Sequence, residues 1–98
     1  MLLVKQLTGL GDINGVMHDF EKAGDILPNH IHTEQDAHIT IVARGKLKAY
    51  SDGWEIVAIP GQLVNFEPGQ AHELMALEDN TRIFNIIKKF GGQSNDYV

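Results

Sequence analysis

With 98 residues, the chain is long enough for one domain with a single modest core and too short for two. Its formal net charge is −5 at pH 7, and because phosphate recognition needs clustered Lys and Arg, nucleic acid is not expected as a partner. The chain has no cysteine, which excludes disulfides, thiolate metal ligands and cysteine nucleophiles. Any bound metal ion would therefore have nitrogen or oxygen ligands.

The opening segment, Met1 to Gln6, is too short and too soon polar to be a signal peptide. No apolar run approaches the roughly 20 residues that a membrane-spanning helix needs. We therefore expect a cytoplasmic protein without a membrane partner.

Short segments with alternating side chains, separated by turn residues, are expected to form β-strands, and none resembles an amphipathic helix of useful length. The connections are typical turn sequences, including a glycine-containing turn at 8–12 and an Asp-Gly hairpin turn at 52–53. Many short strands with regular turns predict an all-β sandwich or a double-sheet barrel. The expected strands cover residues 2–7, 16–21, 26–32, 38–43, 46–50, 54–59, 62–67, 72–77 and 81–88.

Period-2 alternation predicts which side chains face the interior. Val16, His18 and Phe20 share one face of their strand, and the segment 38–43 is apolar on both faces, so it is expected at the centre of a sheet. The predicted lining carries few charges, although Arg44, near a strand end, could reach the mouth of the barrel. The other predicted inward positions are Thr40, Val42, Leu47, Ala49, Val64, Phe66, Leu74, Ala76, Ile83 and Asn85.

Four of the five histidines lie where predicted strands begin or end. His30 and His32 share a face of one strand, His38 follows a polar loop, and His72 follows the turn at 68–69. Imidazole suits Fe, Ni, Cu, Zn and, less well, Mn, so we predict that the four residues meet at one divalent metal ion. The alternative is that they are ordinary solvated histidines in surface loops.

The spacing of these histidines resembles the first motif of the cupin family, which has two histidines one residue apart, a glutamate and then a glycine. Here His30 and His32 are followed by His38 in the place of the glutamate, and Gly45 comes seven positions later. The resemblance extends from about Phe20 to Ile86.

The second cupin motif has a glycine, a proline, another glycine and a histidine at set spacing. Gly61, Gly69 and His72 keep that spacing, while Glu67 replaces the usual proline. The asparagine that the family has four residues beyond the histidine is Ala76 here. Two motifs with retained spacing imply a cupin-type double-stranded β-helix, a jelly-roll barrel of about residues 16–89 in a single domain of 1–98, followed by a flexible tail at 90–98.

The resemblance is compatible with several functions. In one, the four histidines hold an ion with open positions, and the chain is a small-molecule metalloenzyme of the dioxygenase, lyase or isomerase type. In the other, they close a tetrahedral structural site, and the chain is a non-catalytic metal- or ligand-binding cupin. A third possibility, a regulatory sensor, is disfavoured because the sequence has no DNA-binding segment.

Replacing the glutamate by His38 removes both a negative ligand and the carboxylate that could accept a proton. His18 is the candidate catalytic base; the alternative is a core-edge histidine bonded to a backbone carbonyl. Glu34 and Asp36 could orient an imidazole, although loop carboxylates are mostly solvated, and Glu73 is expected to face away from its neighbour His72. The predicted partner at the site is a small molecule bound through the metal ion and apolar contacts.

A homodimer is also expected. The apolar start of the chain, Leu2 to Val4, and the outer side of the strand with Ile39 and Ile41 would be covered by a second copy. The alternative is that these faces are covered by the second sheet of the same chain.

Overall fold

The computed structural model describes residues 2–10, 13–30, 35–66 and 71–89, and these ranges form nine β-strands. None of these ranges contains a helix that could span a membrane. The nine strands, with no helix among the described residues, confirm the predicted all-β fold. The strands are β1 (Leu2–Leu10), β2 (Ile13–Phe20), β3 (Ile26–His30), β4 (Gln35–Arg44), β5 (Leu47–Ser51), β6 (Trp54–Ala58), β7 (Leu63–Phe66), β8 (His72–Ala76) and β9 (Thr81–Lys89).

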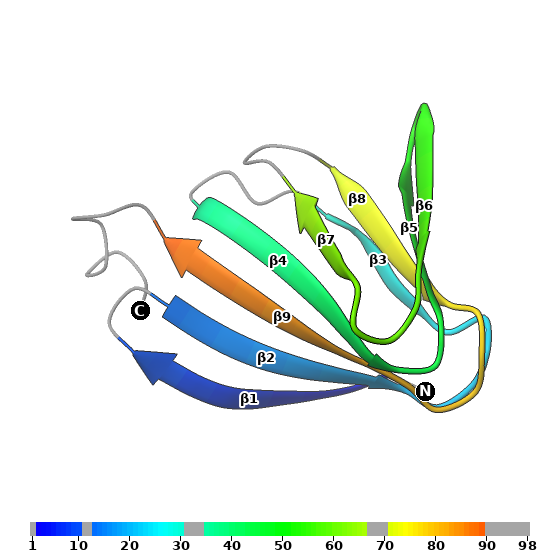
Figure 1. The fold of residues 1–98 in the computed structure, drawn as a ribbon, viewed down its shortest axis with the longest axis horizontal. Helices are drawn as coiled ribbons and strands as arrows, with labels where there is room; N and C mark the ends of the chain where they lie inside the picture. The colour runs from blue at the N-terminus through cyan, green and yellow to red at the C-terminus, as the bar shows by residue number, and fades with distance from the viewer. Residues whose placement is uncertain (1, 11–12, 31–34, 67–70, 90–98) are drawn as a thin grey trace.

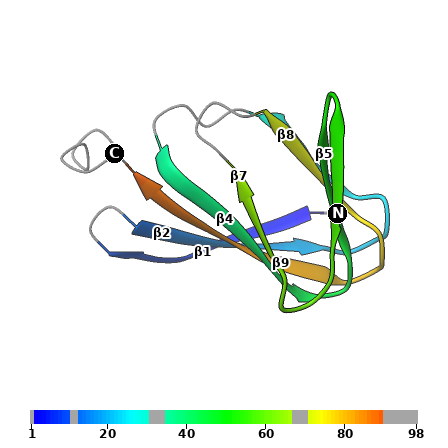
Figure 2. The ribbon, with the colours of Figure 1, turned by 45° about the horizontal axis from the view of Figure 1, so that its top comes forward.

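The strands form two antiparallel sheets that face each other (Figure 1). The larger sheet has the order β1-β2-β9-β4-β7, and the smaller has the order β3-β8-β5-β6. The chain changes sheet at most connections after β2, so strands far apart in sequence become neighbours, as in a jelly roll (Figure 2). Strand β4 lies between β9 and β7, which confirms the central position predicted from its two apolar faces.

The core lies between the inward faces of the two sheets. All ten inward positions predicted from Thr40 to Asn85 are buried, and His18 and Phe20 are buried as well. The polar members of this set lie mainly toward one end of the barrel, while the other end is filled by Phe20, Val42, Leu47 and Ala76. The period-2 pattern therefore identified the interior correctly because both sheets bury only one face.

Two predicted turns are shorter than expected. Strand β1 continues through Thr8 and Gly9, which pair with β2 across a register shift after Gln6, so the predicted turn at 8–12 is wrong in its first half. Strand β4 begins at Gln35, within the predicted loop, because β9 extends to Lys89 and supplies a partner strand there. In both cases pairing with a neighbouring strand draws in residues whose own propensity favours a loop.

Candidate metal centre

The larger sheet contributes three strands to a polar region of the barrel interior. Strand β2 carries His18, β4 carries His38 and Thr40, and β9, which lies between them, carries Asn85. Their side chains are buried, with at most 7% exposure. The opposite wall is β8, which contributes His72 with 0% exposure. Residues from four strands thus meet in the buried interior of the barrel.

His38 and His72 lie close together although they belong to different sheets. Their ring centroids are 5.1 Å apart and the ring planes are tilted by 57°. Phe66, at the end of β7, stacks on His72 with a centroid separation of 3.9 Å and lies 5.2 Å from the ring of His38. The structure therefore brings these two predicted ligands together against one aromatic side chain.

The separation of the two rings is compatible with one shared metal ion. With metal–nitrogen bonds of about 2.0–2.1 Å, two imidazole rings at angles of about 90–110° on one ion have centres about 4.5–5.2 Å apart. The observed separation of 5.1 Å lies in this range. Both rings are also held in place by packing, which is the condition for a preorganised site.

The other two predicted ligands are only partly located. The backbone of His30 ends β3 and is paired with that of His72 on β8, so His30 lies beside the site. Its side chain, and all of His32, lie outside the described residues. Among the side chains that the structure describes, no group of three or more His, Cys, Asp or Glu is placed to hold an ion. The four-histidine set therefore remains a prediction.

Asn85 connects the two histidines of the larger sheet. Its Oδ1 lies 3.2 Å from Nε2 of His38, and its Nδ2 lies 3.2 Å from Nδ1 of His18. The Thr40 hydroxyl donates to the same Oδ1 at 2.5 Å. Thr40 is directly opposite Asn85 in the sheet, and the two histidines occupy diagonal positions on either side, which explains how one amide reaches all three.

This network was not recognised in the sequence. Asn85 was predicted to face inward, but no role was assigned to it, and the same is true of Phe66. A usable signal existed, because an asparagine at an inward position of an otherwise apolar strand must have hydrogen-bond partners when buried. His18 occupies the interior as predicted, and its catalytic role stays a prediction.

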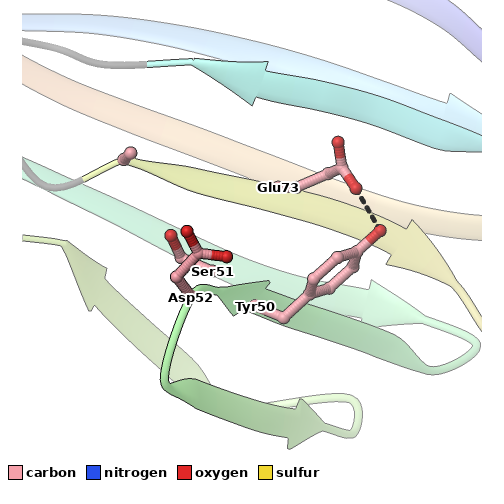
Figure 3. Close-up of a pocket in the computed structure, with 5 residues that line it drawn as sticks. Tyr50, Ser51, Asp52 and Glu73 are labelled. Atoms are coloured by element: carbon pink, nitrogen blue, oxygen red, sulfur yellow. Dashed lines mark hydrogen bonds between the residues drawn. The ribbon is translucent and has the colours of Figure 1, made fainter.

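The two charged candidates whose side chains the structure describes, Glu73 and Arg44, do not lie in this interior region. Glu73 faces away from His72, as predicted, and accepts a hydrogen bond from the Tyr50 hydroxyl (Figure 3). Arg44 was expected to reach the mouth, but it lies at the opposite end of β4 from His38, where its Nε donates to the Asn80 carbonyl at 2.8 Å. Glu34 lies outside the described residues, and so does the side chain of Asp36.

Tyr50 and Glu73 belong to a separate pocket of about 310 Å³ on the outer side of the smaller sheet (Figure 3). The hydrogen bond to Glu73 raises the pKa of the Tyr50 phenol, with smaller contributions from burial and from the carboxylate charge. The residues that line this pocket are Tyr50, Ser51, Asp52, Ala71 and Glu73. The predicted centre at His38 and His72 is therefore a different place in the molecule.

No family model matches the chain, and no curated protein matches it. Solved structures, however, are similar to it over most of its length. KdgF from Halomonas sp. has a TM-score of 0.82 and 18% sequence identity, with 94% of this chain and 82% of that one covered. An RmlC-like cupin from Desulfovibrio desulfuricans has a TM-score of 0.80 and 23% identity, covering 89% and 81%.

A Cupin_2 domain of an XRE-family transcriptional regulator from Enterobacter cloacae is also similar, with a TM-score of 0.78 and 17% identity. It covers 91% of this chain and 97% of that domain. Identities at this level establish the fold alone. The chain therefore has the cupin-type jelly-roll fold.

Proposed function

We propose that this chain is a metal-binding cupin that holds one divalent ion with His30, His32, His38 and His72 and acts there on a small organic molecule. One observation carries the proposal: His38 and His72 are buried together with ring centroids 5.1 Å apart, and His30 is paired with His72 across β3 and β8. Two neighbouring imidazoles, with a third histidine in the adjacent strand, are seldom buried in the core of a small domain unless they bind a ligand.

The ion, when bound, supplies a Lewis acid whose full +2 charge is not reduced by a carboxylate ligand, so it favours anionic or enolate-like groups. The chain's own residues provide the rest. Phe66 covers one face of His72, and the buried residues around the two rings are mostly apolar, which favours a small and largely apolar molecule. His18 and Asn85 offer hydrogen bonds from the larger sheet.

Metal content is the first test. Protein purified without nickel-affinity chromatography should carry about one divalent ion per chain by mass spectrometry of the elements. His72→Ala and His30→Ala should each weaken Zn²⁺ binding at least 100-fold while the circular dichroism of the β-sheets is retained. Glu73→Ala, at the outward-facing neighbour of His72, is the matched control and should keep the ion. Equal Zn²⁺ affinity in the wild type and both alanine variants would refute the proposed ligand set.

Coordination then separates the two possible uses of the ion. X-ray absorption of the loaded protein should show an oxygen ligand in addition to the histidine nitrogens. Loading with Fe(II) under anaerobic conditions and measuring oxygen uptake with small diketones, phenols and thiols tests the dioxygenase reaction specifically. A closed shell of four nitrogens would instead identify a structural site and overturn the enzymatic part of the proposal.

A further inference from the structure

We infer that Asn85 is a positioning residue that sets the tautomers of His38 and His18, so that His38 offers Nδ1 to an ion and His18 is a hydrogen-bond donor at Nε2. The role at an ion depends on the proposed function, whereas the tautomers themselves do not.

The orientation of the Asn85 amide is the first step. Thr40 Oγ1 lies 2.5 Å from the amide atom assigned as Oδ1. In this arrangement the amide oxygen accepts from the Thr40 hydroxyl and the amide nitrogen faces Nδ1 of His18.

The tautomer of His38 follows. Because an amide oxygen only accepts hydrogen bonds, the His38 nitrogen that lies 3.2 Å from Oδ1 must carry the proton. A neutral imidazole with its proton on Nε2 has an in-plane lone pair only on Nδ1. A metal-bound histidine typically donates from one ring nitrogen to a fixed acceptor while the other nitrogen binds the ion. Asn85 would be that acceptor, and Nδ1 of His38 would be the ligand atom.

The opposite argument applies to His18. The amide NH₂ only donates, so Nδ1 of His18, 3.2 Å away, must accept. A neutral His18 then carries its proton on Nε2. The lone pair on Nδ1 of His18 already accepts the hydrogen bond from Asn85. His18, which was predicted to be a catalytic base, is therefore a hydrogen-bond donor at Nε2 in the resting protein. Such a donor is suited to orienting or stabilising an anionic group rather than to removing a proton.

Asn85→Asp is the most informative substitution because it keeps the shape and removes the donor. A carboxylate accepts from both sides, so His38 should keep its proton on Nε2 while His18 should gain a proton on Nδ1. If Asn85 only filled space, its replacement by Asp would give no reason for the protonated nitrogen to change at His18 and not at His38. Asn65→Asp, on the exposed face of β7, is the matched control and should change neither.

The measurement is long-range ¹⁵N–¹H correlation NMR of the histidine rings in metal-free protein at about pH 8, above the ordinary histidine pKa of about 6.5. His18→Gln and His38→Gln assign the signals by loss of one ring each. The wild type should show both rings protonated on Nε2, and this result stands even if Asn85→Asp fails to fold. A wild-type His38 protonated on Nδ1, or a folded Asn85→Asp protein whose His18 keeps Nδ1 unprotonated, would overturn the inference.

Adding Zn²⁺ distinguishes this inference from the proposed function. Zn²⁺ should perturb Nδ1 of His38 and leave the proton on Nε2 in place. Ligation through Nε2 would overturn the inference while the metal site survives. If Zn²⁺ did not bind at all, the proposed function would fail, and the tautomers of the metal-free protein would still decide the role of Asn85.

Discussion

Phe66 lies flat against His72, with ring centroids 3.9 Å apart and planes only 13° from parallel, although the two residues belong to different sheets. The stacked pair therefore joins the two sheets at the candidate site. An aromatic face holds an imidazole more tightly than a flexible aliphatic side chain does, because the contact restricts the tilt of the ring.

Phe66→Leu tests the importance of this contact. The barrel should remain folded, with a loss of about 1 kcal/mol, since the substitution keeps most of the apolar volume. The Zn²⁺ affinity should fall about 10-fold, the lower end of the effect expected when the support of a ligand is removed. Phe84→Leu, at a half-buried position on the outer side of β9, should leave the affinity unchanged. Isothermal titration calorimetry with Zn²⁺ measures the affinity of both variants. An unchanged affinity in Phe66→Leu would contradict the role of Phe66 in holding His72.

Gly45, the glycine of the first motif, lies between β4 and β5, and the structure gives a physical reason for a glycine there. Its φ is +85°, and an added Cβ would collide with Oγ1, Cα and Cβ of Thr81. Gly45→Ala should therefore cost distinctly more stability than the roughly 1–2 kcal/mol of left-handed strain alone. Gly53→Ala is the matched control, because φ is +87° there and nothing lies within 4 Å of the added carbon. Urea unfolding compares the two, and equal losses would show that contact with Thr81 is unimportant.

The Tyr50–Glu73 hydrogen bond predicts a pH dependence. It holds the pKa of the Tyr50 phenol above its ordinary value near 10, so the bond stabilises the fold below that pH. The stabilisation is lost as the pH rises through the raised pKa of the folded state. Glu73→Gln should shift phenolate formation at Tyr50 to lower pH. Ultraviolet absorbance measures this titration, in a Tyr97→Phe background that removes the other tyrosine. Glu78→Gln, at an exposed position, should leave the titration unchanged, and an unshifted Glu73→Gln curve would refute the coupling.

The expected homodimer can be tested on the outer side of the larger sheet. The register places Met17, Phe84, Ile41 and Leu63 in one row across β2, β9, β4 and β7, and Leu63 is 63% exposed. A two-fold axis through this row would bury it against its own copy. Light scattering should give twice the chain mass of 10.9 kDa at micromolar concentration, and Ile41→Lys should give the monomer.

Ile26→Lys is the control for this prediction. Ile26 is 42% exposed on the outer side of the smaller sheet, so the same substitution there should leave the association unchanged. A wild-type mass of one chain would rule out the dimer, and the apolar row would then be an ordinary exposed patch.

Most of the fold was predictable from local patterns. Period-2 alternation identified the inward side chains from Thr40 to Asn85, and the Asp-Gly sequence predicted the β5–β6 hairpin, where Ser51 pairs with Trp54. These features depend on neighbouring residues alone, since each sheet buries one face. The limits of β1 and β4 were missed because a strand ends where its pairing ends. Strand β1 is extended by pairing with β2, the next strand in the chain, and β4 by pairing with β9, which is distant in sequence.

Recognising the candidate site required both the sequence and the tertiary structure. Histidine spacing along the sequence was sufficient to nominate His38 and His72 as ligands, because it places His38 near the start of β4 and His72 at the start of β8. Only the tertiary structure could set the two rings 5.1 Å apart and aim one amide of Asn85 at two histidines. Those distances follow from the register of β2, β9 and β4 and from the packing of one sheet on the other, which no single segment encodes.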